Sequence, residues 1–146
     1  MDVDSKLPSM PLRDRELSSK VIQCAIRVHQ VLGSGYLESL YEQALCIELR
    51  SSAIVHERQK SIPVTYAGEL IGEHRLDLLV ENRLIVELKA SRSLDAIHFA
   101  TLRSYLKALD LESGLLVNFA SMPLTVKRVG REWLPKAAAA DSASIN

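Results

Sequence analysis

The sequence has few features that would by themselves assign it to a special class of protein. No apolar run approaches the ~20 residues that span a bilayer, and the first residues lack the apolar core of an export signal. The only cysteines are Cys24 and Cys46. Both lie in apolar helical patterns, which predicts small core residues rather than a disulfide framework or a zinc site. We therefore expect a cytoplasmic protein without a membrane segment.

An excess of charge of one sign is also missing, because 18 basic and 18 acidic side chains give a formal net charge of +0. Proteins that bind phosphate backbones non-specifically are usually basic, since Lys and Arg displace counterions. The charge of the whole chain therefore does not indicate nucleic-acid binding, and a local basic face stays open.

The length and composition fit one globular domain. The chain has 146 residues, of which 47% are hydrophobic, enough to build a core without disulfides or metals. Residues 1–13 contain prolines and show no periodicity, which predicts a flexible N-terminal arm. Residues 135–146 are rich in Ala and Ser and predict a flexible tail. The domain itself is expected to span residues 14–134.

Hydrophobic periodicity predicts the secondary structure. Apolar residues spaced by three and four predict helices at about residues 14–32, 37–50 and 94–109. Asp14 is the expected N-cap of the first helix, and Gly33 follows its end. Strands are expected at about residues 55–66, 70–80, 84–90 and 114–119, with a last edge strand at 127–133. Pro63 places the first of them at an edge or at a bulge.

The order of these elements, α-α-β-β-β-α-β, predicts the fold class. Consecutive strands, a helical crossover and a further strand indicate an α/β protein with a mixed sheet flanked by helices. Four strands are expected in this sheet, or five if the last segment joins it.

Three charged residues interrupt strands that are otherwise apolar. Asp77 lies within the second predicted strand, at 70–80, and Glu87 and Lys89 lie within the third, at 84–90. Inner strand positions rarely carry charge unless it is paired or binds a ligand. A three-residue loop at 81–83 would place Asp77 opposite Glu87, with Lys89 on the same face. A two-residue loop would instead place Asp77 opposite Val86.

Such a cluster has the chemistry of a metal site. Two ionised carboxylates at that distance repel each other, and a divalent cation relieves the repulsion because hard cations bind carboxylate oxygens. A neighbouring Lys can then orient a water molecule or stabilise a developing anion. Glu38 borders the apolar stripe of the second helix and could join the site. The competing interpretation is a structural cross-strand ion cluster in which Lys89 only neutralises the acids.

Several motifs together resemble a known family. Gly35-x-x-Glu38-x-x-Tyr41 is followed by Arg75-Leu76-Asp77 and then by Glu87-Leu88-Lys89. Over roughly residues 14–131 the chain resembles GxxExxY proteins, a bacterial group in the PD-(D/E)XK nuclease superfamily. The resemblance implies a restriction-endonuclease-like core and a metal-dependent nuclease, with DNA as the expected nucleic-acid partner and RNA left open.

The resemblance also implies roles for individual residues. Asp77, Glu87 and the backbone carbonyl of Leu88 would bind Mg²⁺ or Mn²⁺, Lys89 would assist the attacking water, and Glu38 would complete the site. Gln59 falls in a family motif without an assigned role.

One position departs from the family pattern. Thr101 stands where related sequences usually have Gln, although Tyr105 is retained, and His98 is the candidate to replace that Gln. The alternative is therefore a weak or inactive nuclease-fold module that binds nucleic acid or a protein. A homodimer also stays open.

Overall fold

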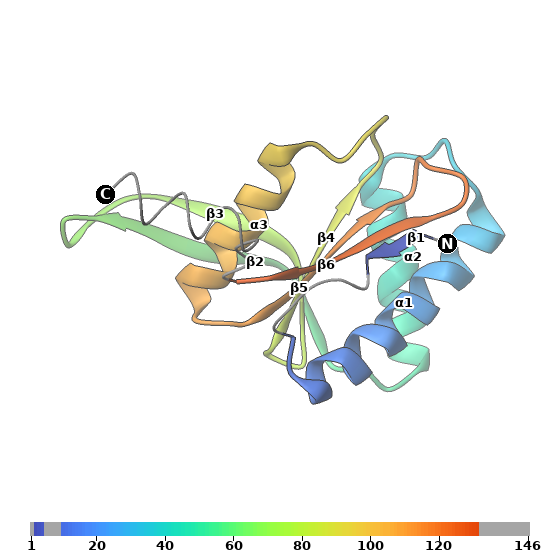
Figure 1. Ribbon diagram of the computed structural model, residues 1–146, viewed down its shortest axis with the longest axis horizontal. Coiled ribbons are helices and arrows are strands. Elements are labelled where there is room, and N and C mark those ends of the chain that lie inside the picture. The colour runs from blue at the N-terminus through green and yellow to red at the C-terminus, as the bar shows by residue number, and fades with distance from the viewer. Residues whose placement is uncertain (1, 5–9, 132–146) are drawn as a thin grey trace, which may run out of the picture.

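The computed structural model describes residues 2–4 and 10–131, which form one sheet with helices packed on it (Figure 1). In chain order the elements are β1 (Asp2–Asp4), α1 (Leu12–Leu32), α2 (Glu38–Ser51), β2 (His56–Tyr66), β3 (Glu69–Val80), β4 (Leu84–Lys89), α3 (Ala96–Leu109), β5 (Ser113–Asn118) and β6 (Thr125–Gly130). The predicted α/β class and the order α-α-β-β-β-α-β are confirmed. None of the described helices combines the length and the apolar character needed to cross a membrane.

The sheet is mixed, as the sequence predicts, but it has six described strands where four or five were expected, because β1 joins it beside β6. Its strands lie in the order β1-β6-β5-β4-β3-β2. β4 and β5 are parallel neighbours joined through α3, β1 is parallel to β6, and the other neighbours are antiparallel. β2 lies at one edge of the sheet. This position agrees with Pro63, because proline has no backbone N–H to donate to a ladder.

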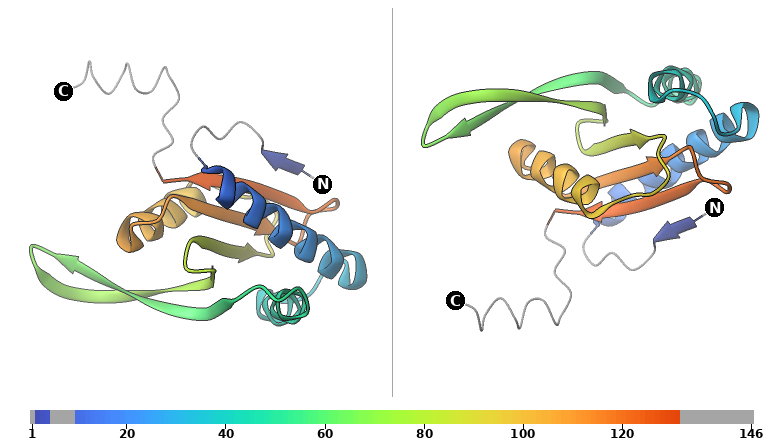
Figure 2. Two further views of the ribbon diagram at one scale, coloured as in Figure 1. Left: turned by 90° about the horizontal axis from the view of Figure 1, so that it is seen from below. Right: turned by 90° about the horizontal axis from the view of Figure 1, so that it is seen from above.

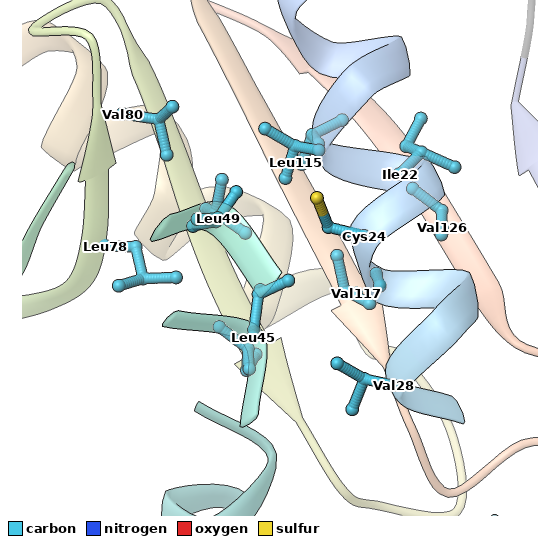
Figure 3. Close-up of a cluster of buried hydrophobic side chains, with 14 of the residues drawn as sticks. Ile22, Cys24, Val28, Leu45, Leu49, Leu78, Val80, Leu115, Val117 and Val126 are labelled. Carbon is cyan, nitrogen blue, oxygen red and sulfur yellow. The ribbon is translucent and has the colours of Figure 1, made fainter. Parts of the chain in front are cut away.

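Each face of the central strands carries its own apolar core, because successive side chains point to opposite faces. Leu78, Val86 and Leu115 pack with residues of α1 and α2 in the larger cluster, part of which is drawn in Figure 3. Their chain neighbours Leu79 and Leu116 pack with residues of α3 in the second cluster. Coverage on both sides explains why these strands are apolar at nearly every position.

The N-terminal part differs from the prediction. Helix α1 begins at Leu12 after Pro11, so Asp14 is not its N-cap. Asp14 is only 4% exposed, and its carboxylate accepts a hydrogen bond from Ser113 Oγ at 2.7 Å and pairs with Arg83 Nε at 3.4 Å. A buried acid needs such partners, and sequence proximity could not reveal them. Residues 2–4, expected in a flexible arm, form β1.

The C-terminal strand also differs in its bounds. β6 spans Thr125–Gly130 rather than residues 127–133, and it lies between β5 and β1 instead of at the edge. The predicted edge position was wrong because no pattern in residues 2–4 indicates β1. The predicted tail at 135–146 lies outside the described residues.

The β2–β3 hairpin extends well beyond the rest of the sheet (Figures 1 and 2). β3 pairs with β4 only from Leu78 to Val80, whereas its pairing with β2 continues to Glu69. We call residues 63–75 the arm. All of them are exposed except the half-buried Val64, so both faces of the arm are open to solvent or to a ligand.

Tyr41 fixes the loop that leads into α2. Its buried hydroxyl donates to the carbonyl of Gly33 at 2.6 Å and accepts the N–H of Tyr36 at 3.2 Å. Its ring stacks on Phe119, with centroids 4.5 Å apart. The Gly35-x-x-Glu38-x-x-Tyr41 motif therefore has a physical basis: the tyrosine holds the glycine loop in place, and the loop sets where Glu38 begins the helix.

Replacing Tyr41 with Phe should keep the ring stacking and remove both hydrogen bonds. Because buried polar groups left without partners cost roughly 1–3 kcal/mol, we expect the free energy of unfolding in urea to fall by about that amount. Tyr36→Phe is the matched control, since the Tyr36 side chain is exposed and its change should stay within about 0.5 kcal/mol. Equal stability of Tyr41→Phe and the wild type would show that the hydroxyl does not fix this loop.

Candidate active site

The turn between β3 and β4 has the odd length that the sequence argument required. Val80 pairs with Leu84, so residues 81–83 form the turn, and Glu81 and Asn82 adopt positive φ angles of 53° and 56°. The ladder ends at the pair Leu78 and Val86. The same register places Asp77 and Glu87 directly after this last pair, at the point where β3 and β4 separate.

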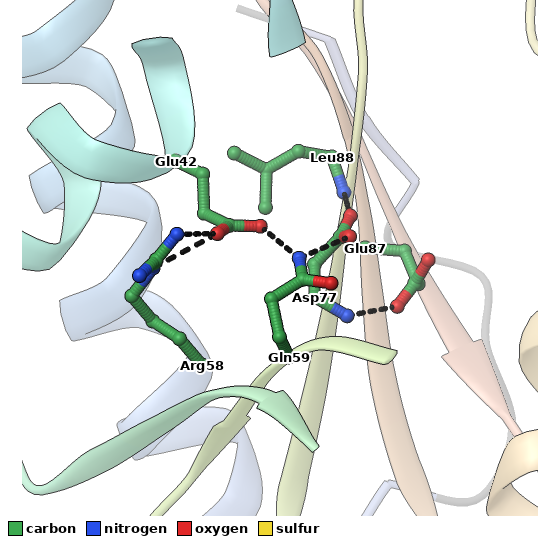
Figure 4. Close-up of polar contacts among 6 residues, drawn as sticks. All are labelled: Glu42, Arg58, Gln59, Asp77, Glu87 and Leu88. Carbon is green, nitrogen blue, oxygen red and sulfur yellow. Dashed lines mark hydrogen bonds and ion pairs between the residues drawn. The ribbon is translucent and has the colours of Figure 1, made fainter. Parts of the chain in front are cut away.

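The two carboxylates bridge the strands beyond the end of the ladder (Figure 4). The backbone N–H of Asp77 donates to Glu87 Oε1 at 2.7 Å. In the opposite direction, the N–H of Leu88 donates to Asp77 Oδ2 at 2.8 Å. Each acid therefore satisfies a backbone donor that the separating strands leave without a ladder partner.

Burial and nearby acidic groups make both acids hard to ionise. Burial is the main cause that raises the pKa of Glu87 to about 8, and the charge of Asp77 is the next. Burial also raises the pKa of Asp77, and Glu42 and Glu38 add to this effect. Lys89 is half-buried, and its positive charge opposes the shift at both carboxylates. The site thus holds more negative charge than its Lys compensates.

A cavity of about 330 Å³ opens beside Asp77 on the side of α2. Its lining consists of Glu38, Ser39, Glu42, Arg58, Gln59, Asp77 and Leu88. The structure therefore brings Glu38, Asp77 and Leu88 to one solvent-reachable point. Among the described residues, Glu87 and Lys89 are not part of this lining. Glu87 accepts the backbone N–H of Asp77, and the charge of Lys89 lowers the pKa of the Asp77 carboxyl.

Glu42 is a member of the site that sequence reasoning missed. It is 4% exposed, and its carboxylate accepts hydrogen bonds from Arg58 Nε at 2.9 Å and from Gln59 Nε2 at 2.8 Å. Gln59 Nε2 also lies 3.5 Å from Asp77 Oδ1, so Gln59 connects the two acids. The available signal was the spacing of Glu38 and Glu42, which lie one helical turn apart on α2.

Gln59 has an unusual backbone for a residue within a strand. Its φ angle is 51°, in the left-handed region that is uncommon for residues other than glycine. The register pairs Arg58 with Leu78 and Lys60 with Leu76, so Gln59 lies across from Asp77. The conformation costs free energy that the surrounding contacts must offset, and it turns the amide toward the two carboxylates.

The candidates on α3 divide into two groups. His98 Nδ1 accepts the N–H of Asp95 at 3.0 Å and so caps the start of the helix. Thr101 is half-buried, and its carbonyl accepts a bond from Ser104. Tyr105 is the α3 residue whose pKa the acids affect. Burial is the main cause that raises this pKa, and the charges of Glu87 and Asp77 raise it further.

The donor set suits a hard divalent cation. Carboxylate and carbonyl oxygens are the preferred ligands of Mg²⁺ and Mn²⁺, and burial, followed by nearby acidic groups, raises the pKa of both Asp77 and Glu87. Within residues 2–4 and 10–131, no three His, Cys, Asp or Glu side chains are grouped as a metal cluster. Asp77 and Glu87 bond to backbone N–H groups instead, so an ion would compete with those donors.

The raised pKa of Glu87 predicts pH-dependent stability in the absence of metal. A carboxyl group with a folded-state pKa of about 8, against an ordinary 4.5, favours folding below the lower value and loses this contribution as pH rises through the higher one. Glu87→Gln cannot ionise and should gain melting temperature relative to the wild type between about pH 5 and about pH 9. Melting in EDTA measures this difference. The exposed control Glu69→Gln should show no such trend, and a pH-independent difference for Glu87→Gln would contradict the shift.

The comparisons with known proteins agree with this geometry. A model of the PD-(D/E)XK nuclease superfamily matches residues 15–129. The fold is similar to the crystal structure of SSO0001, with a TM-score of 0.52 and 18% identity over 94% of this chain and 87% of that chain. An alkaline exonuclease from Laribacter hongkongensis has a TM-score of 0.49 and 11% identity over 94% of this chain and 77% of that chain. A search of curated proteins found no significant match.

At 18% identity the structure of SSO0001 bears on the fold alone, and the family that the model matches has the restriction-endonuclease-like core that the sequence predicts. The family model, by contrast, spans most of the chain and includes Glu38, Asp77, Glu87 and Lys89. This chain therefore belongs to the PD-(D/E)XK nuclease superfamily.

Proposed function

We propose that this protein is a metal-dependent nuclease that hydrolyses phosphodiester bonds of nucleic acids, and that it is a GxxExxY member of its superfamily. The observation that carries the proposal is the pair of buried acids, Asp77 and Glu87, that bridge β3 and β4 beyond the end of their ladder. Two adjacent carboxylates cost free energy when both ionise. A divalent cation bound beside them would relieve that cost, because hard cations bind carboxylate oxygens.

The residues that would hold Mg²⁺ or Mn²⁺ are Asp77, Glu87 and the carbonyl of Leu88. Glu38 lines the same cavity as Asp77 and would bind directly or through water. A bound ion at these residues would supply polarisation of the scissile phosphate and a lowered pKa for a water molecule.

Lys89 supplies the positive charge of the mechanism. It is half-buried, and its charge reaches both Asp77 and Glu87. From this position the ammonium group orients the attacking water and stabilises the negative charge that develops on the phosphate. A neutral side chain at this position could do neither.

Glu42 and Gln59 act as positioning residues. Glu42 holds the amide of Gln59, and the same amide faces Asp77 Oδ1. Arg58 neutralises Glu42 from the other side. This chain of contacts restricts the Asp77 carboxylate, and a restricted ligand loses less entropy when it binds.

The α3 positions contribute less than the resemblance implies. Thr101 is shorter than the glutamine usual there, and His98 is engaged as a cap. Tyr105 keeps its hydroxyl proton because its pKa is raised, so it can donate to an anionic group near the acids. DNA is the expected substrate, and the cleavage test described below also includes RNA.

Metal binding gives the first test. Because a ligand that binds only the folded state stabilises it by about 2.7 kcal/mol at 100 times its Kd, Mg²⁺ or Mn²⁺ should raise the melting temperature of the wild type. Asp77→Asn should abolish the shift, since asparagine can still accept the Leu88 N–H but carries no charge. The exposed Glu69→Gln is the control and should keep it. A wild type that does not respond to either metal would overturn the proposed site.

Cleavage gives the second test, on single-stranded, double-stranded and branched DNA and on RNA. We expect Lys89→Ala to lower kcat by about 100-fold or more and Glu87→Gln to abolish turnover. Lys20→Ala, on the exposed face of α1, removes the same charge and should cleave normally. Equal cleavage by all variants would identify a contaminating nuclease. Metal binding without cleavage of any substrate would favour the binding-module alternative.

A further inference from the structure

A second cavity lies between the arm and α3. It has a volume of about 420 Å³, which is within the size range of pockets for small ligands. Its lining consists of Ile62, Pro63, Val64, Thr65, His74, Ser104, Tyr105, Lys107 and Ala108. Figure 2 shows the hairpin and α3 extending beside each other, away from the N-terminal helices. We call this cavity the arm groove.

The strand register shows which side of the arm forms this groove. His74 lies directly opposite Ile62, so the two share a face. Ile62 is buried in the core beneath α3, and His74 therefore faces α3 as well. The next pair on this face is Val64 and Gly72, and Gly72 has no side chain to fill the space. The pairing of β2 with β3 therefore determines which residues form this side of the groove.

Tyr105 connects the groove with the strands that carry the acids. It is 7% exposed, lines the groove and packs in one core cluster with Leu76 and Ile85, which lie next to Asp77 in β3 and two residues before Glu87 in β4. Its ring also contacts His74, with centroids 5.4 Å apart. A chain molecule lying in the groove would therefore extend toward the two carboxylates.

The charges of the two cavities are opposite in character. The cavity at Asp77 is lined by Glu38, Glu42 and Asp77, which suits a cation. Among the described residues that line the arm groove, none is acidic, and Lys107 and His74 are present. The groove therefore suits an anionic ligand, and the apolar residues Pro63 and Val64 supply a surface for flat rings.

We propose that the arm groove binds an unpaired stretch of a nucleic-acid strand and guides it toward Asp77 and Glu87. This inference rests on the proposed function and adds a substrate class to it. A base stacks on the exposed ring of His74 beside Pro63 and Val64, and a phosphate lies against Lys107. Only an unpaired base presents its ring face for stacking, because the bases of a duplex are already stacked on one another.

The test measures affinity without turnover. The full-length Asp77→Asn variant in EDTA is titrated against an end-labelled oligothymidine and against a duplex containing the same strand, by fluorescence anisotropy. On this background, Lys107→Glu and His74→Ala should each weaken binding of the oligothymidine by about tenfold. His74→Phe should retain affinity within about threefold, because a phenyl ring also stacks. Lys107→Ala should reduce the dependence of binding on salt.

Lys20→Glu is the matched control, because it makes the same charge change on α1, in the wall of a different cavity. It should leave the affinity unchanged. Unchanged affinity in both Lys107→Glu and His74→Ala would overturn the proposal, and so would an equal loss in Lys20→Glu. If the duplex binds as tightly as the oligothymidine and loses as much affinity in both groove variants, the preference for an unpaired strand is overturned. Melting temperatures confirm that each variant is folded.

The two proposals can fail separately. If the wild type cleaves with Mg²⁺ while the groove variants bind as tightly as their parent, the groove assignment is wrong and the nuclease proposal stands. If the groove variants lose affinity for the oligothymidine and the wild type shows neither metal binding nor cleavage, the groove assignment stands and the nuclease proposal is wrong.

Discussion

The separation of β3 from β4 is the constraint on which the rest of the site depends. Where the ladder ends, two backbone N–H groups lose their strand partners, and the carboxylates of Asp77 and Glu87 accept them. The fold thus uses the same acids that a cation would need. These two bonds place the acids beside each other, and the charge of Asp77 raises the pKa of Glu87. Stability and ligand binding therefore depend on the same oxygens and cannot be optimised independently.

The part of the site that the sequence could predict is the part with local causes. Strand alternation identified Asp77, Glu87 and Lys89 as charges in apolar surroundings, and the length of the β3–β4 turn determined which residues face each other. The structure has that register and that turn. Turn length and the two-residue period act over a few positions, so a single sequence contains them. The edge position of β2 followed from Pro63 for the same reason.

The rest depended on partners far away in the chain. Asp14 has the residue type of an N-cap, yet it is buried against Arg83 and Ser113. Glu42 has the residue type of an exposed helical acid, and only the position of Arg58 and Gln59 shows otherwise. His98 was a candidate to replace the missing glutamine, and its Nδ1 accepts the N–H of Asp95 at the start of its own helix. No pattern within the sequence indicates which side chains a fold brings together over such separations.

The bond between Asp14 and Ser113 joins residues 99 positions apart. During translation, α1 leaves the ribosome long before the strand that carries Ser113 has been made. Until then the carboxylate of Asp14 must remain hydrated, and the helix cannot take its final place on the sheet. Contacts between residues so distant in sequence form late and slow folding. Newly made chains therefore pass through an interval with an exposed apolar helix face, and the speed of elongation sets how long that interval lasts.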